Sequence, residues 1–269
     1  MVYLQTPQLE RNNAHPPRAL LRLPESRKIR RAAPGKQSDA PWRATLALIE
    51  HQVPFVRRRL KRGAVVQHAG DAFEFLHLVR WGAVKAVGVA AEDGYAQITG
   101  LHVKGDWVGF DSLGQDLCVS DVCAMNDIEI WSLRYVTVLA LARQLPELVH
   151  ILHAAMAEQL ARERHWRMAL ATMPADARLA DFLCLWAHTL AQRELRDDHI
   201  AVHLTRSEVA NYLGMSLETA SRSFSRLAQL GLVSFEFEGR RYFDIPDMVA
   251  LEEFIGRRRH ACAAALPRY

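Results

Sequence analysis

The chain has 269 residues, 50% of them hydrophobic, with 34 Lys and Arg, 30 Asp and Glu and a formal net charge of +4. This length allows one large domain or two smaller ones, and the composition allows a sizeable core. No apolar run reaches the ~20 residues of a membrane helix, and the N-terminus lacks the apolar segment of a signal peptide. We therefore expect a cytoplasmic protein and exclude the membrane and secreted classes.

Residues 1–40 differ in composition from the rest of the chain. They carry eight Lys or Arg, three Asp or Glu and five prolines. This composition predicts a disordered basic arm, although a contact of the arm with nucleic-acid phosphates is an alternative. Subtracting the arm leaves 26 basic and 27 acidic residues, a net charge of −1. The basic pI therefore does not indicate DNA binding by the body of the chain.

Residues 41–145 are predicted to form a β-rich domain after a short helix at 44–50. Nine of the fourteen glycines lie between Gly63 and Gly114, separated by short runs such as FEFLHLVR and AVKAVGV. Glu92-Asp93-Gly94 is a hairpin turn signal, and a further strand pair is expected between residues 118 and 133. Short strands with evenly spaced glycine turns are typical of a β-sandwich or barrel-like roll.

A long helix is predicted over residues 146–173, opened by Pro146. At ~27 residues it would be ~40 Å long. Heptad-like spacing is seen at four apolar residues, namely Val149, Leu152, Met156 and Leu160. A parallel coiled-coil dimer would cover these residues; packing within one chain is the alternative.

Residues 174–250 are predicted to form a winged helix–turn–helix domain, followed by a tail at 251–269. A short helix is expected from Met248, and a frayed end with Arg257, Arg258 and Arg259 follows it. A helix over 176–196 and a strand over 200–204 precede the motif. Thr205 and Glu208 form a capping box that starts its first helix. Gly214 lies in the turn, and Ser216 caps a second helix that ends near Leu230. The alternating run SFEFEGRRYFDI then predicts a hairpin.

The second helix of this motif has two faces. Five residues form a predicted apolar stripe, namely Leu217, Ala220, Phe224, Leu227 and Leu230. Glu218, Ser221 and Arg222 fall on the other face, where Arg suits guanine, Glu suits cytosine and Ser suits several base edges. Groups that suit phosphate contacts are also present in the domain, namely Thr205, Ser216, Thr219, Arg226, Arg240 and Arg241. A plain solvated helix face is the alternative.

The order of a glycine-rich β-roll, a long helix and a winged helix resembles the CRP/FNR family of bacterial transcription regulators. The most specific match is LTRSEVANYLG followed by ETASR, whose E-x-x-S-R spacing resembles the FNR branch and its FixK/DNR-type members. The resemblance implies an α+β fold with a cyclic-nucleotide-binding-like β-roll, a dimerisation helix and a winged helix. It also implies base reading by Glu218, Ser221 and Arg222.

The resemblance further implies the partners of the chain. A homodimer would bind double-stranded DNA at a palindrome of TTGAT-type half-sites, with its two recognition helices ~34 Å apart. RNA polymerase is the implied protein partner, and genes of oxygen-limited or nitrogen-oxide respiration are the implied targets. The sequence leaves activation or repression open, together with the identity of any effector.

The family's known signal sites are changed in this chain. No cysteine precedes Cys118, so the iron–sulfur cluster of oxygen-sensing members is not expected. Gly109-Phe110-Asp111 replaces the G-E-L of cyclic-AMP receptors, and Cys118-Val119 occupies their R-S pair, so cyclic AMP is not expected either. Haem is an open possibility, with four candidate ligands, namely His51, His68, His77 and His102.

We predict no metal site and no catalytic site. None of the four cysteines forms a C-x-x-C pair. His150 and His153 are spaced to share a metal ion, but a solvated helix face is the preferred interpretation. A phosphate loop, a nucleophile elbow and an H-E-x-x-H motif are all missing from the sequence, which argues against an enzyme. The competing function is a small-molecule sensor whose winged helix contacts proteins.

Overall fold

The computed structural model describes residues 50–89, 96–193, 199–201, 204–235 and 242–265. The described residues all belong to one compact unit within residues 39–269. Several predictions lie outside the described residues: the basic arm, most of the helix at 44–50, the turn at 92–94 and the pair Arg240 and Arg241. None of the described helices combines the length and the apolar character needed to cross a membrane.

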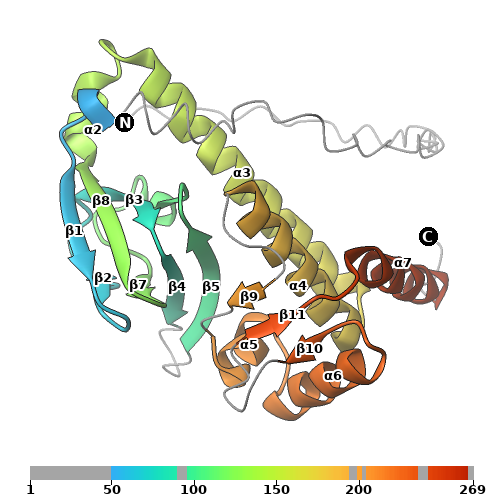
Figure 1. The fold of residues 1–269 in the computed structure, drawn as a ribbon. Coiled ribbons are helices and arrows are strands. Elements are labelled where there is room, and N and C mark those ends of the chain that lie inside the picture. The colour runs from blue at the N-terminus through green and yellow to red at the C-terminus, as the bar shows by residue number, and fades with distance from the viewer. Residues whose placement is uncertain (1–49, 90–95, 194–198, 202–203, 236–241, 266–269) are drawn as a thin grey trace, which may run out of the picture. The chain divides into compact units, whose positions relative to one another are not determined.

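The N-terminal half is a β-roll of two four-stranded antiparallel sheets (Figure 1). One sheet has the order β1-β8-β3-β6, with bounds Val56–Leu60, Ile128–Arg134, Phe75–Trp81 and Trp107–Val108. The other has the order β2-β7-β4-β5, with bounds Val65–Gln67, Asp121–Ala124, Ala83–Val89 and Ala96–Val103. The predicted β-roll is thereby confirmed, and alternate residues of its strands, such as Leu76 and Leu78, fill its core.

Two turns of the β-roll contain glycine for steric reasons. Gly82 has a φ of 83°, and a Cβ placed on it would lie 2.5 Å from the carbonyl oxygen of Asp127. Gly109 has a φ of 102° and caps η1, the short helix Phe110–Ser112. Both positions use the left-handed backbone conformation that glycine adopts without strain.

The long helix is α3, Pro146–Thr172, which follows α2, Tyr135–Leu141. Figure 1 shows α3 running from the β-roll to the C-terminal half. Leu148 and Leu152 are buried in a cluster with β-roll residues, whereas Leu160 is 60% exposed. The four predicted dimer residues are therefore not equivalent, because Leu152 is already covered within its own chain.

The C-terminal half contains the predicted helix–turn–helix and a three-stranded sheet of order β10-β11-β9. Its elements are α4 Ala175–Gln192, β9 His199–Ala201, α5 Arg206–Tyr212, α6 Leu217–Gln229, β10 Ser234–Phe235, β11 Tyr242–Asp244 and α7 Met248–Ala265. Phe235 of β10 pairs with Phe243 of β11 in antiparallel register, as the alternating pattern predicts. The described part of the wing is therefore a strand pair beside the helix–turn–helix.

The end of the chain differs from the predicted tail. Helix α7 has 18 residues, so the boundary expected after residue 250 falls inside it. Leu251, Phe254 and Ile255 are buried in the same cluster as α4. Their spacing of three and four residues places them on one face of a helix. The prediction of a short helix was wrong because the consecutive arginines after this stretch suggested a solvated end.

Candidate nucleic-acid interface

The caps and turn of the helix–turn–helix have the predicted geometry. The Thr205 hydroxyl accepts from the Glu208 backbone N–H at 3.2 Å, and the Glu208 carboxylate accepts from the Thr205 N–H at 2.7 Å. This reciprocal pair is a complete capping box. Gly214 has a φ of 58°, and the Met215 N–H donates to the carbonyl of Ala210. Those contacts fix where α6 begins relative to α5.

Helix α6 begins at a Ser216 cap, whose hydroxyl accepts from the Thr219 N–H at 3.2 Å. Its buried side consists of four residues, namely Ala220, Ser223, Phe224 and Leu227. Leu217 and Leu230 are 46% and 53% exposed, so the predicted apolar stripe was wrong at both ends. They are the first residue and the C-cap of the helix, and the buried contacts lie between them.

The predicted base readers lie on the other side of α6. Glu218 and Arg222 are exposed and Ser221 is half-buried. A hydrogen bond from its own backbone N–H, followed by one from the Ser216 hydroxyl, lowers the pKa of Glu218. Arg222 Nη2 donates to Thr219 Oγ1 at 3.4 Å. An ionised acceptor and a guanidinium therefore stand one turn apart at the start of the helix.

The predicted phosphate contacts already have roles within the chain. Thr205 and Ser216 cap α5 and α6, and the Thr219 hydroxyl accepts from Ser216 at 3.0 Å. Arg226 Nη1 lies 3.3 Å from Asp176 Oδ2, although its side chain is 55% exposed. Of these four residues, Arg226 is the one that would have to leave an ion pair in order to bind a phosphate.

Helix α5 is held by residues that the sequence analysis did not single out. Glu208 forms an ion pair with Lys85 of β4. The Asn211 side chain accepts from the Ile98 N–H at 2.7 Å and donates to the Ala96 carbonyl at 2.8 Å. These contacts connect α5 to β4 and β5. Since each partner is more than 100 residues away in the chain, no local pattern could have revealed them.

Aromatic packing connects α5 to α3 and α4. The rings of Tyr212 and Trp166 are stacked at 5.1 Å, and Phe182 meets Tyr212 edge-on at 5.6 Å. Burial is the main cause that raises the pKa of Tyr212 to about 12. The phenol therefore stays neutral, and the helix–turn–helix is packed directly against the long helix.

Two buried carboxylates of α4 organise the surrounding helices. Asp176 pairs with Arg258 of α7 at 2.6 Å as well as with Arg226 of α6. Asp181 lies 2.6 Å from His165 of α3 and 3.7 Å from Arg259 of α7. A buried carboxylate requires such partners because its desolvation is costly. Helices α3, α6 and α7 are therefore connected to α4 by charge as well as by apolar contacts.

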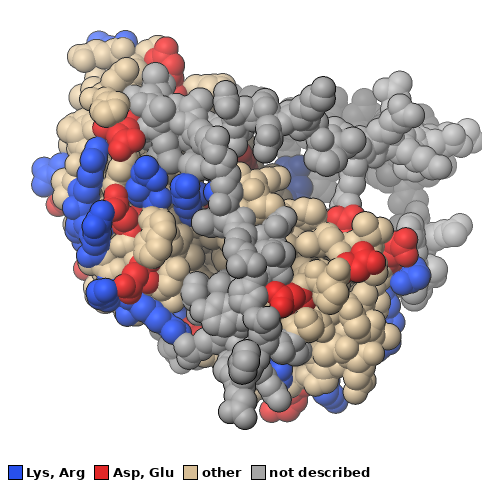
Figure 2. Space-filling model, viewed as in Figure 1, with Lys and Arg blue, Asp and Glu red and all other residues tan. Residues whose placement is uncertain are grey.

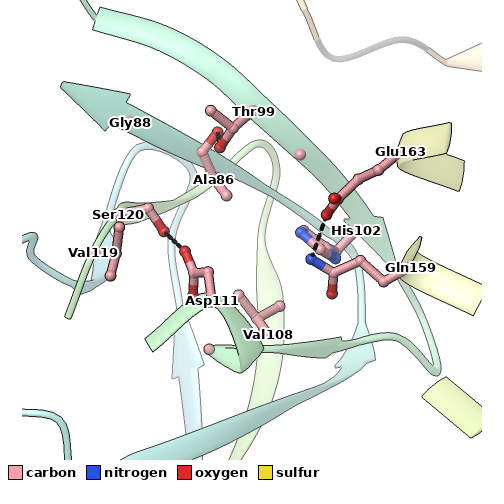
Figure 3. A pocket seen from close by; sticks show the side chains of 12 residues that line it. Ala86, Gly88, Thr99, His102, Val108, Asp111, Val119, Ser120, Gln159 and Glu163 are labelled. Carbon is pink, nitrogen blue, oxygen red and sulfur yellow. Dashed lines mark hydrogen bonds between the residues drawn. The ribbon is translucent and has the colours of Figure 1, made fainter. Parts of the chain in front are cut away.

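A cavity of about 210 Å³ lies between the β-roll and α3. Figure 3 shows His102, Gln159 and Glu163 on one side of it and Asp111 with Ser120 on the other. Asp111 Oδ2 accepts from the Ser120 hydroxyl at 2.7 Å. His102 is buried, and this burial is the main cause that lowers its pKa. Its ring is therefore neutral at physiological pH.

The cavity does not fit a cyclic nucleotide. Its twelve lining residues include the carboxylates of Asp111 and Glu163 and no Lys or Arg. A nucleotide phosphate would meet negative charge where it needs a cation. The prediction that Cys118-Val119 occupies the place of the R-S pair was wrong for Cys118. Val119 and Ser120 line this cavity, whereas Cys118 lines a separate one with His77.

The candidate haem ligands are dispersed. His77 is buried, shares a hydrogen bond of 2.9 Å with Ser132 Oγ, and has its pKa lowered to about 4, chiefly by burial. His68 lies 3.6 Å from Asp121, and His51 is exposed. Only His102 lines the cavity described above, which leaves it as the candidate best placed to meet a ligand there.

Basic side chains gather on a different part of the molecule. In the face shown in Figure 2, Lys and Arg cluster over the side of the β-roll that carries β1. Arg59 and Lys61 pair there with Glu129 and Asp127 at 3.0 and 2.7 Å. This group of basic side chains therefore belongs to the β-roll and not to α6.

Comparison with known proteins matches both halves of the chain. Residues 57–144 match the model of the cyclic nucleotide-binding domain, and residues 177–254 match that of the Crp-like helix-turn-helix domain. The transcriptional regulatory protein btr of Bordetella pertussis is 30% identical over 201 residues, which cover 75% of this chain and 81% of that protein. The fumarate and nitrate reduction regulatory protein of Escherichia coli is 28% identical over 204 residues, covering 76% and 80%.

A solved structure shares the fold. FixK2 from Bradyrhizobium japonicum superposes with a TM-score of 0.66 at 22% identity, covering 75% of this chain and 97% of that one. At this identity the likeness concerns the fold alone. It extends over both the β-roll and the C-terminal half.

Proposed function

The chain belongs to the CRP/FNR family of DNA-binding transcription regulators, and from this premise we propose that it reads a palindrome of TTGAT-type half-sites as a homodimer. One observation carries the proposal. Helix α6 buries Phe224 and Leu227 and leaves Glu218 and Arg222 exposed at its start. That arrangement presents an acceptor and a forked donor to a major groove.

The dimer would form along α3. Leu160 is 60% exposed, and Val149 and Met156 are half-buried in a single chain. A helix of 27 residues provides a long enough seam for a coiled-coil pair. Burying these side chains against a second copy would remove apolar surface from water and place two α6 helices on one side of the assembly. Leu152 is already buried in its own chain and would support the β-roll side of the seam without facing the second copy.

The base-reading role is tested by Arg222→Ala. We expect it to weaken binding to a TTGAT palindrome by about 1–3 kcal/mol and to leave binding to a scrambled duplex nearly unchanged. Arg257→Ala is the matched control, since Arg257 is an exposed arginine of α7. Fluorescence anisotropy at one fixed salt concentration measures all six affinities, those of the wild type and the two variants on both duplexes. Equal losses on both duplexes would contradict base reading by Arg222.

We also propose that the regulator controls respiration genes together with RNA polymerase.

We further propose that it uses neither an iron–sulfur cluster nor cyclic AMP. The acidic lining of the cavity supports the exclusion of cyclic AMP. An absorbance spectrum of protein purified without oxygen tests the cofactor. We expect neither a Soret band nor a broad visible shoulder. A Soret band would instead assign haem, and a shoulder would assign an iron–sulfur cluster.

The alternative is an effector-sensing module whose winged helix contacts proteins. The small cavity beside His102 favours a ligand. The segment 205–241 is only weakly basic, with five Arg and four Glu. A salt titration separates the two functions, because DNA affinity falls steeply as salt rises. A chain without measurable DNA affinity at low salt would support the alternative.

A further inference from the structure

A cluster of three metal-binding side chains lies at the contact between α4 and α7. Cys184 and His188 are four residues apart on α4, and Glu252 comes from α7. Their ligand atoms, one from each side chain, all lie within 4.8 Å of one another. Because Glu252 is 64 residues beyond His188, this cluster has no signature in the sequence, where we predicted no metal site.

The ligand atoms of Cys184 and His188 both lie close to one carboxylate oxygen of Glu252. His188 Nε2 lies 3.1 Å from Glu252 Oε1, and Cys184 Sγ lies 3.9 Å from the same atom. Around a tetrahedral Zn²⁺, with bonds of roughly 2.0–2.3 Å, neighbouring ligand atoms are about 3.3–3.6 Å apart. These two spacings differ from the tetrahedral values by only a few tenths of an ångström, and the third, between Cys184 Sγ and His188 Nε2, is within 4.8 Å.

We propose that Cys184, His188 and Glu252 bind a first-row transition-metal ion of the Zn²⁺ class that fastens α7 to α4. A thiolate with an imidazole and a carboxylate selects such ions over Mg²⁺ and Ca²⁺, which prefer oxygen ligands only. On binding, the Cys184 thiol loses its proton to solvent and the sulfur becomes a metal ligand. The imidazole binds as the neutral ring.

One of the three side chains is buried and two are partly exposed, which leaves a coordination position open to water. Cys184 is buried, whereas the side chains of His188 and Glu252 are 49% and 38% exposed. Three protein ligands would thus hold the ion from the inner side, and water would complete a tetrahedron from the outer side. The neighbouring Glu253 carboxylate lies 4.0 Å from Arg257 of its own helix, which leaves Glu252 as the acid of α7 that serves the cluster.

The position of the site links it to the stability of the C-terminal half. Helix α4 packs against both α6 and α7. The ion pairs of Arg258 and Arg259 with Asp176 and Asp181 join α7 to α4 nearer the start of α4. The metal site would add a second point of attachment further along α4. Removal of the ion is therefore expected to lower the unfolding temperature of this half, and its replacement to restore it.

Cobalt binding to the full-length, chelator-treated protein tests the proposal. We expect one Co²⁺ per chain, with a thiolate-to-cobalt charge-transfer band in the near ultraviolet that excess Zn²⁺ removes. Cys184→Ser should abolish the band, and Cys123→Ser is the matched control that should retain it. His188→Ala and Glu252→Gln should each weaken binding at least about tenfold, since even partners that only orient a ligand contribute about that much.

Two outcomes would overturn the proposal. One is a cobalt spectrum without the thiolate band, or with a band that persists in Cys184→Ser. The other is unchanged Co²⁺ affinity in His188→Ala and Glu252→Gln, whose half-exposed side chains can be replaced without emptying the core. The cobalt readout needs no DNA, so its failure is distinct from a failure of the DNA-binding proposal.

Discussion

The two halves of the chain differ in how they relate to the family pattern. In the C-terminal half, Glu218, Ser221 and Arg222 stand on one helix and occupy the side that its packing leaves open. In the β-roll the fold is kept, but Asp111 and Glu163 line the cavity where a cyclic-nucleotide receptor needs a cation. The proposed reading surface consists of neighbouring residues of one helix, whereas the cavity is assembled from strands and a distant helix.

The two halves also bury their polar groups differently. The β-roll buries the histidines His77 and His102, and burial lowers the pKa of both rings. The C-terminal half buries Asp176 and Asp181, each within reach of a basic side chain. A ring that burial keeps neutral makes folding less favourable in acid, because the unfolded chain takes up a proton that the folded chain refuses. The buried histidines therefore predict an acid response that arises in the β-roll.

The largest effect is expected in the core of the C-terminal half. Leu227→Ala should lower the free energy of unfolding by about 2–5 kcal/mol, because Leu227 is fully buried on α6. Leu217→Ala on the same helix should cost below about 0.5 kcal/mol, because Leu217 is 46% exposed. Urea unfolding measures both. Similar losses for the two variants would contradict the burial pattern of α6.

Acid should weaken the β-roll through its buried histidines. The folded pKa of His77 is about 4, below its ordinary value of 6.5, so the unfolded chain takes up a proton that the folded chain refuses. The contribution of this ring to the free energy of unfolding is complete above pH 6.5. It falls by about 3 kcal/mol as the pH drops towards 4. His102 acts in the same direction. His77→Gln should flatten the pH profile of urea unfolding, and an unchanged profile would exclude His77 as the cause.

The contact between the halves should have a smaller effect. Glu208→Gln preserves a side chain that can complete the capping box but removes the charge that pairs with Lys85. We expect a coupling of about 1 kcal/mol between Lys85→Met and Glu208→Gln in a double-mutant cycle of unfolding free energies. Additive losses would mean that the ion pair does not hold α5 to the β-roll.

The smallest effect concerns the start of α6, the proposed recognition helix. Ser216→Ala should cost about 0.5–1 kcal/mol of unfolding free energy, because the Thr219 N–H loses its acceptor. Ser216→Asp provides another acceptor and should recover most of the loss. Thermal unfolding of the three proteins checks this, and a Ser216→Asp variant no more stable than Ser216→Ala would argue against the capping role.

Local patterns predicted most of the fold, and long-range contacts explain what they missed. The capping box at Thr205, the Ser216 cap and the turn at Gly214 depend on residues within a few positions of one another, and each is present. The extent of α7 and the bonds of Asn211 depend on segments far apart in the chain. The same holds for the Cys184 cluster, whose third ligand comes from another helix.

We propose that this chain keeps the DNA reader of its family and has lost the nucleotide receptor. The most direct test is the affinity for a TTGAT palindrome and for a scrambled duplex, each measured with and without saturating cyclic AMP. We expect at least about 10³-fold tighter binding to the palindrome than to the scrambled duplex, and the same ratio after the nucleotide is added. A ratio near one, or a preference that emerges only with cyclic AMP, would contradict it.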